Sequence, residues 1–156
     1  MEFDFQLLRE ADAVIAAFER EGLRYALTGG FAVALYGHVR ATRDIDYLCH
    51  PDDIHQASTI LVQLGYKPHA QPWTFRQSGI TLHRHMKSID QTELFHVVDL
   101  LVPPEDRVYW ITQAERVKWG HEGMVSVVTS HHLIEMKKLR GSVTDQNDIA
   151  HLESGR

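Results

Sequence analysis

The sequence predicts an α+β fold in which a mixed β-sheet is flanked by helices. Strand-like apolar runs and helix-like amphipathic stretches both occur, and they do not follow the strict alternation of a βαβ protein. The 156 residues are 44% hydrophobic and 24% charged, which is typical of a soluble globular chain with its own core. We therefore expect residues 1–156 to form one domain, with a C-terminal helical segment at about 130–153 packing alongside the sheet.

The first half of the chain predicts three helices and two strands. Apolar residues recur at helical spacing from Phe3 to Arg20, and Gly22 marks a helix end. The segment "LRYALT" is short, apolar and followed by two glycines, so it predicts a strand. In chain order the expected elements are a helix at 3–20, a strand at 23–28, a helix at 31–37, a strand at 43–50 and a helix at 51–65.

The second half predicts two hairpins, a strand and two helices. Gly79 lies at the centre of "WTFRQSGITLHRHM", and "GHEG" separates two apolar runs further on. Ser130 is positioned to cap a helix that ends at Gly141. In chain order the expected elements are a hairpin at 73–86, a strand at 95–102, a hairpin at 115–129, a helix at 131–140 and a helix at 144–153.

Charge and composition exclude several classes of function. The net charge is −5 and basic residues are not clustered, so we do not expect binding to a long polynucleotide through its backbone. Cys49 is the only cysteine, which excludes an internal disulfide and favours a reducing compartment. The acidic first residues are unlike a signal peptide, and no apolar run is long enough to span a bilayer. We expect a cytoplasmic protein without a membrane partner.

Asp44 and Asp46 are the first candidates for a functional site. Residues two apart in a strand point to the same face, so these carboxylates lie side by side while Ile45 faces the core. At about 4 Å they repel by roughly 1 kcal/mol in water and about 4 kcal/mol when partly buried. A divalent cation between them would offset that cost, and oxygen ligands favour Mg²⁺ or Mn²⁺ over zinc.

Asp99 is a third candidate ligand. It lies within the apolar run "HVVDLLV", where a buried acid needs a partner. If its strand lies beside residues 43–50, Asp99 completes a three-carboxylate site, which can hold two metal ions for in-line displacement at phosphorus.

Gly29 and Gly30 add a phosphate-binding feature. They end a strand and open a helix, where unpaired N–H groups favour phosphate, and glycine lets the backbone approach the ligand closely. Gly-Gly alone marks many turns, but two strand-borne aspartates just downstream make the combination specific.

The segment "TGGFAVALYGHVRATRDIDYL" resembles the signature of the nucleotidyltransferase fold, the DNA polymerase β superfamily. It is similar to the branch that contains aminoglycoside and lincosamide nucleotidyltransferases and abortive-infection toxins. The C-terminal "LIEMKKLRGSVTDQNDIAHL" resembles the closing helices of these proteins, with Lys137, Asp145 and Asp148 at the matching positions. Phe31 replaces the polar residue often found beside the glycines, and the chain lacks a large acceptor-binding domain.

The resemblance implies transfer of a nucleoside monophosphate from an NTP to an acceptor hydroxyl, with release of pyrophosphate. It implies that Asp44, Asp46 and Asp99 are catalytic and hold the metal, Mg²⁺ or Mn²⁺, with Asp99 also the base. It implies that Gly29 and Gly30 cradle the triphosphate. The acceptor would be a small molecule, a tRNA end or a protein.

Three basic residues are further candidates for nucleotide binding. Arg40 and Arg43 precede the Asp44 strand, where they would touch phosphate or form an ion pair that orders the loop. Lys137 would neutralise phosphate charge.

Structural interpretations of the same residues stay open. Asp44 and Asp46 could be strand-edge charges that face water, and Asp99 could pair with an arginine. Asp145 and Asp148 are better explained as helix-start and packing residues than as catalysts. His83 and His85 share a strand face and His131-His132 opens a helix, but zinc needs three or four convergent ligands, so we do not expect a zinc site from the sequence.

Two other functions compete with catalysis. The chain could be an idle nucleotidyltransferase-like module that binds nucleotide or a partner protein, which predicts binding without turnover. It could also be one member of a toxin–antitoxin pair. The position of Asp99 relative to Asp44 separates the idle module from the enzyme.

Overall fold

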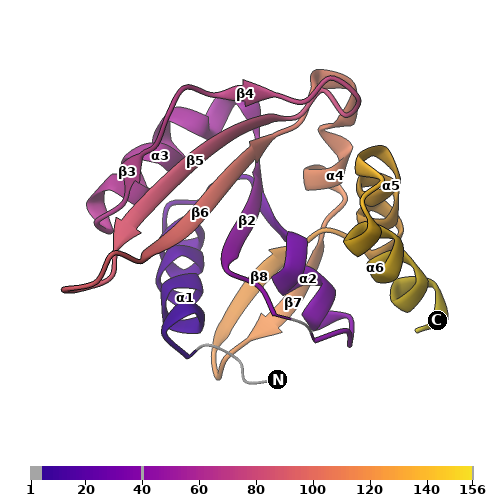
Figure 1. Cartoon of the computed structure of the whole chain (residues 1–156), viewed down its shortest axis with the longest axis horizontal. Helices are drawn as coiled ribbons and strands as arrows, with labels where there is room; N and C mark the ends of the chain where they lie inside the picture. The colour runs from indigo at the N-terminus through magenta and orange to yellow at the C-terminus, as the bar shows by residue number, and fades with distance from the viewer. Residues whose placement is uncertain (1–4, 40, 156) are drawn as a thin grey trace.

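The computed structural model describes residues 5–39 and 41–155, and there it confirms the α+β fold with one mixed sheet of eight strands. The strand order is β3-β5-β6-β2-β1-β8-β7, and β4 pairs with β5 outside this order (Figure 1). The strands are β1 (Tyr25–Thr28), β2 (Asp44–Cys49), β3 (Lys67–Pro68), β4 (Trp73–Thr74), β5 (Thr81–Ser88), β6 (Phe95–Val102), β7 (Glu115–Trp119) and β8 (Gly123–Val127). The α-helices are α1 (Phe5–Arg20), α2 (Gly29–Leu35), α3 (Ile54–Gln63), α4 (Tyr109–Thr112), α5 (Ser130–Arg140) and α6 (Val143–Ser154).

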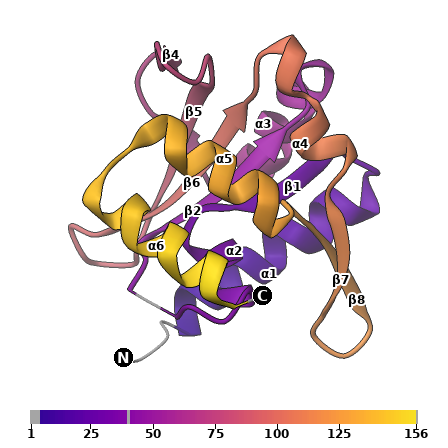
Figure 2. The same ribbon diagram turned by 90° about the vertical axis from the view of Figure 1, so that its right-hand side faces the viewer.

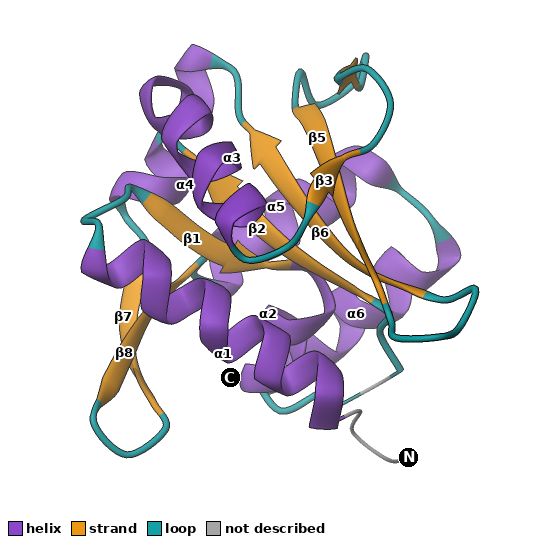
Figure 3. Cartoon of the chain, turned by 90° about the vertical axis from the view of Figure 1, so that its left-hand side faces the viewer, coloured by secondary structure: helices purple, strands orange, loops and turns teal. Residues whose placement is uncertain are grey.

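Helices cover the sheet from both sides. α1 and α3 lie on one face, and α5 and α6 lie on the opposite side (Figures 2 and 3). The apolar stripe of α1 packs on the sheet, and there the Tyr47 hydroxyl donates a hydrogen bond to the Ala11 carbonyl at 3.3 Å. Tyr47 and Ile45 are fully buried, so the odd-numbered residues of β2 build the core under α1. The even-numbered aspartates therefore point to the other side of the sheet, toward α5.

The register of the central strands places four polar residues in one row across the sheet. β2 runs antiparallel to β1 and parallel to β6, so Asp46 lies between Thr28 and Asp99. β5 is antiparallel to β6 and sets Arg84 opposite Asp99. A one-residue shift of any of these strands would move its member of the row to the core face.

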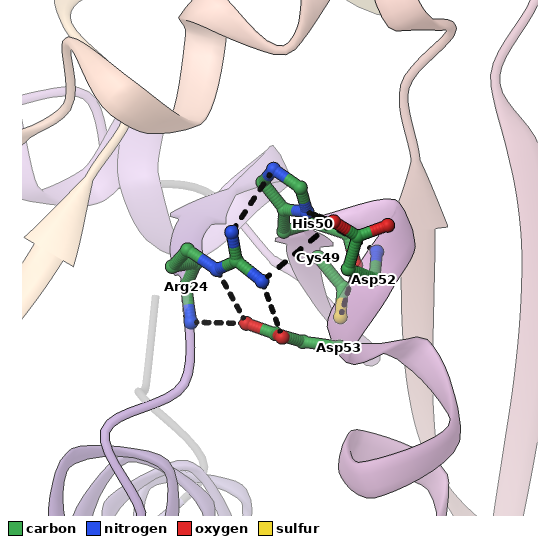
Figure 4. A network of polar contacts seen from close by, with 5 residues as sticks. All are labelled: Arg24, Cys49, His50, Asp52 and Asp53. Carbon is green, nitrogen blue, oxygen red and sulfur yellow. Dashed lines mark hydrogen bonds and ion pairs between the residues drawn. The ribbon is translucent and has the colours of Figure 1, made fainter.

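The far end of β2 is held by an ion-pair network (Figure 4). The Arg24 backbone N–H and its guanidinium both donate to the Asp53 carboxylate, over distances of 2.8–3.0 Å. Arg24 lowers the pKa of Asp53, mainly through its side-chain hydrogen bonds. His50 accepts a hydrogen bond from the Asp52 backbone N–H through Nδ1 at 3.1 Å. These contacts fix the connection from β2 to α3, and Asp44 and Asp46 occupy the opposite end of the strand.

Several predicted boundaries were wrong by a few residues, and three elements were missed: β3, α4 and the short 3-10 helix Glu105–Arg107. α2 begins at Gly29 rather than at 31, because the glycine pair itself forms the first turn. The cap of α5 is Thr129, whose side chain accepts from His132 N, and not Ser130. The hairpin expected at 73–86 has only Trp73–Thr74 as its first strand. β3 and α4 were not predicted, since segments of two and four residues are too short to show a periodic pattern.

Across the described residues, no helix combines the length and apolar character needed to cross a membrane.

Candidate active site

A cavity of about 620 Å³ lies between the sheet and α5. Its sheet side includes Asp44, Asp46 and Asp99, from the adjacent strands β2 and β6. Leu133 and Met136 of α5 line the cavity from the helical side. The structure thus brings the three predicted carboxylates to one cavity, although Asp99 lies 53 residues after Asp46 in the sequence.

Burial and the charge of Asp99 make Asp44 and Asp46 harder to ionise. Burial first, and then the charges of Asp99 and Asp44, raise the pKa of Asp46 to about 7, against the opposing charges of Arg140 and Lys137. The pKa of Asp44 is also raised, first by burial and then by Asp99, while Arg84 and Arg43 oppose the shift. A site that destabilises its own negative charge in this way is complementary to a cation.

Asp99 is paired with an arginine that the sequence reading did not assign. Arg84 Nε donates to Asp99 Oδ1 and Arg84 Nη2 donates to Oδ2, each at 2.9 Å. Asp99 is only 4% exposed, so this bidentate pair provides the partner that a buried acid requires. Arg84 Nη2 also lies 3.6 Å from Asp44 Oδ2. Each carboxylate oxygen of Asp99 keeps a second lone pair for another ligand.

Gly29 and Gly30 both line the cavity, at the start of α2. Gly29 has a φ of +65°, and a Cβ built on it would lie 2.2 Å from Asp46 Oδ2. Only glycine therefore fits between the first turn of α2 and the Asp46 carboxylate. The side chain of Thr28, which precedes the helix, makes no capping bond to it and donates instead to Met136 Sδ at 3.8 Å.

Lys137 lines the cavity but is held by carboxylates of α6. Its Nζ lies 3.0 Å from Asp148 Oδ2 and 3.5 Å from Asp145 Oδ1, and all three side chains are buried. Asp145 also forms a capping box with Ser142 and pairs with Arg140 Nε at 2.9 Å. Asp145 is thus a helix-start residue, and Lys137 joins α5 to α6 rather than pointing free into the cavity.

The remaining candidates divide into one inside the cavity and one that cannot be placed. Arg43 lines the cavity and is exposed. Arg40 lies outside the described residues. Arg84 and Arg140, which also line the cavity, were missed. The sequence feature that could have identified Arg84 is its position between His83 and His85 in a strand, which puts its side chain on the face opposite to theirs. His85 is buried there and hydrogen-bonded to Ser58 Oγ at 2.8 Å.

Comparison with known proteins identifies the family. Residues 2–136 match a family model described as "Uncharacterised nucleotidyltransferase". This chain belongs to that nucleotidyltransferase family. The resemblance seen in the glycine pair and the Asp44-Ile45-Asp46 motif is therefore confirmed, and the enzyme is a nucleotidyltransferase. No functionally curated protein matches the chain.

Solved structures share the fold of this nucleotidyltransferase at low sequence identity. A putative nucleotidyltransferase from Thermotoga maritima has a TM-score of 0.67 and 15% identity, with 99% of this chain and 97% of that chain covered. The lincosamide antibiotic adenylyltransferase LnuA, solved with lincomycin bound, has a TM-score of 0.63 and 16% identity, with coverage of 95% and 97%. ANT(2″)-Ia, in complex with adenylyl-2″-tobramycin, has a TM-score of 0.62 and 16% identity, with coverage of 96% and 88%.

Proposed function

We propose that this nucleotidyltransferase moves a nucleoside monophosphate from an NTP to an acceptor hydroxyl and releases pyrophosphate. The observation that carries the proposal is the convergence of Asp44, Asp46 and Asp99 in one cavity beside Gly29. The acceptor oxygen forms a bond to the α-phosphorus, the bond from that phosphorus to the bridging oxygen breaks, and pyrophosphate leaves with the electron pair. Asp99 accepts the acceptor's proton through a lone pair that Arg84 does not use.

Mg²⁺ or Mn²⁺ is the cofactor that the site fits. The donor set is made of carboxylate oxygens, which these hard cations prefer. Burial and the charge of Asp99 raise the pKa of Asp44 and Asp46, and a cation between them would reverse that effect. Asp44 and Asp46 would hold the cation, with Asp99 beside them. When bound, it would neutralise charge on the triphosphate and polarise the phosphorus–oxygen bonds.

The chain's own residues position the nucleotide. Gly29 and Gly30 let the backbone of the first turn of α2 approach the phosphates. Arg43 and Arg140 line the cavity, and their positive charges would offset the repulsion between the triphosphate and the three carboxylates. Lys137 contributes less directly, because its ammonium group is shared between two buried aspartates of α6.

The acceptor would enter from the side of Arg84. A neighbouring hollow of about 330 Å³ shares Phe75, Leu82 and Arg84 with the main cavity and also includes Trp73 and His69. Trp73 is 64% exposed, and the residues that line this hollow include no carboxylate. A polycationic acceptor would find no complementary charge there, whereas an exposed indole beside a guanidinium suits a stacked base and its phosphate. An acceptor with a nucleobase, such as an RNA end, fits this surface best.

The test is transfer from α-labelled and γ-labelled NTPs in the presence of Mg²⁺ or Mn²⁺ and fractions of a cell lysate. Label from the α position should enter the RNA fraction, and label from the γ position should not. Asp46→Asn should lower transfer by at least about 100-fold, while Asp90→Asn, at an exposed turn, should leave it unchanged. No detectable transfer with any of the four NTPs and either metal would contradict the proposal.

The acceptor side is tested separately. Trp73→Ala should raise the KM for the RNA acceptor without changing NTP binding, and Phe95→Ala is the matched control, because Phe95 is exposed at the other end of the sheet. Label in the small-molecule or protein fraction would retain the transferase and reject the RNA acceptor. The idle-module alternative would be favoured if Asp99 lay far from Asp44, and the adjacency of their strands does not favour it.

A further inference from the structure

The first turns of α5 carry a group of metal-binding side chains outside the catalytic cavity. His131, His132 and Glu135 each present one ligand atom, and these three atoms lie within 4.8 Å of one another. The residues of α5 that line the cavity are others, among them Leu133 and Met136. The group is therefore separate from the carboxylates of β2 and β6. The sequence analysis found no third ligand for the histidine pair. The helix supplies Glu135, because residues three and four apart in a helix share a face.

His132 provides an independent indication of a ligand. The residue is 9% exposed, and among the described residues its Nδ1 is the buried side-chain nitrogen or oxygen atom without a hydrogen-bond partner. Leaving a buried polar atom unpaired costs about 1–3 kcal/mol. Burial lowers the pKa of His132, which favours the neutral imidazole, and only this form can bind a metal ion.

Glu135 is held in a fixed orientation by α4. The Tyr109 hydroxyl and the Trp110 indole N–H both donate hydrogen bonds to Glu135 Oε1, the latter at 3.2 Å. The Tyr109 ring also packs edge-on against His132, with ring centroids 5.0 Å apart. Carboxylates that ligate metals are usually oriented in this way by surrounding hydrogen bonds. Two members of the group thus have their positions set by the same short helix.

We propose that His131, His132 and Glu135 bind a zinc-class transition-metal dication at the junction of α4 and α5. Two imidazoles and one carboxylate, with a water in the fourth position, form a common three-ligand zinc arrangement. Imidazole ligands select such a metal over the Mg²⁺ expected between Asp44 and Asp46. The bound ion would cross-link the first turns of α5, whose Glu135 is hydrogen-bonded to α4, and α5 forms one wall of the cavity.

The test uses the 156-residue chain with the Asp46→Asn change in excess Mg²⁺, so that the carboxylates of the cavity do not take up the added metal. Equilibrium dialysis against Zn²⁺ should give one ion per chain. Co²⁺ in its place should give the intense visible absorption of a four-coordinate site. His131→Gln should weaken binding at least about tenfold. His131 is exposed, so this change should not disturb folding.

Two further variants make the result specific. Glu135→Gln keeps the hydrogen bonds from α4 but loses the carboxylate, so it should also lose the metal. His121→Gln removes an exposed histidine from the β7–β8 turn and should bind as before. The proposal is overturned if Zn²⁺ is not retained, if His131→Gln and Glu135→Gln bind as tightly as the parent, or if Co²⁺ shows only the weak spectrum of the hydrated ion.

Discussion

Arg84 and Asp99 face each other across β5 and β6 and are joined by two hydrogen bonds of 2.9 Å, Nε to Oδ1 and Nη2 to Oδ2. The pair lies at the edge of the carboxylate cluster, where Arg84 also approaches Asp44. The arginine therefore neutralises part of the charge that a second metal ion would otherwise neutralise. In the proposed function Asp99 would be shared between Arg84 and the ligand of the cavity.

Replacing this arginine should make the site more dependent on metal. Arg84→Gln leaves the buried Asp99 without its cationic partner, which we expect to destabilise the metal-free fold by about 2–3 kcal/mol. Mn²⁺ should then raise the Tm of the variant more than that of the wild type. Arg116→Gln is the control, because Arg116 makes a similar bidentate pair with Glu19 far from the cavity. Equal Mn²⁺ shifts in Arg84→Gln and the wild type would contradict this account.

Gly29 should tolerate no side chain. Gly29→Ala places a methyl group 2.2 Å from Asp46 Oδ2 at a positive φ, so the first turn of α2 or the carboxylate must move. Gly120→Ala shares the positive φ but meets nothing within 4 Å. Both changes should cost about 1 kcal/mol in backbone strain, and only Gly29→Ala should also abolish transfer. Thermal denaturation and the transfer assay measure the two effects, and an active Gly29→Ala enzyme would refute the close approach.

The pKa of Asp46 predicts how the stability of the metal-free protein depends on pH. The folded state keeps the proton up to about pH 7, whereas the unfolded chain releases it near the ordinary value of 3.8. The unfolded state thus binds fewer protons between these values, and the free energy of unfolding falls as pH rises from about 4 to about 7. Asp46→Asn should lack this contribution and be more stable than the wild type at pH 8 by up to about 4 kcal/mol.

Denaturant melts of both proteins at pH 5 and pH 8, with EDTA present, measure that difference. Saturating Mg²⁺ should raise the stability of the wild type at pH 8 and have little effect on Asp46→Asn. If the free energy of unfolding changes equally in the wild type and the variant between pH 5 and pH 8, the ionisation of Asp46 does not destabilise the fold.

Lys137 should matter more for stability than for nucleotide binding. Lys137→Met leaves Asp145 and Asp148 buried without the ammonium group between them, which should cost about 3–5 kcal/mol and lower the Tm by about 10 °C. Lys138→Met is the matched control, since Lys138 is exposed and its ion pair is a long, exposed one, with 3.9 Å between Nζ and Glu153 Oε1. It should change the Tm by little. If Lys137→Met keeps its Tm and loses only NTP affinity, the lysine serves the phosphate instead.

The sequence by itself determined the elements that have a clear pattern and the residues that form a local motif. The amphipathic period of α1, the apolar run of β6 and the glycine pair before Asp44-Ile45-Asp46 are local signals, because each depends on neighbours along the chain. The tertiary structure alone decided the rest. Asp99 reaches Asp46 because β6 pairs with β2 in parallel, and Arg84 reaches Asp99 because β5 pairs with β6 in that register. Strand order and register arise from packing between distant segments, and no spacing along the chain encodes them.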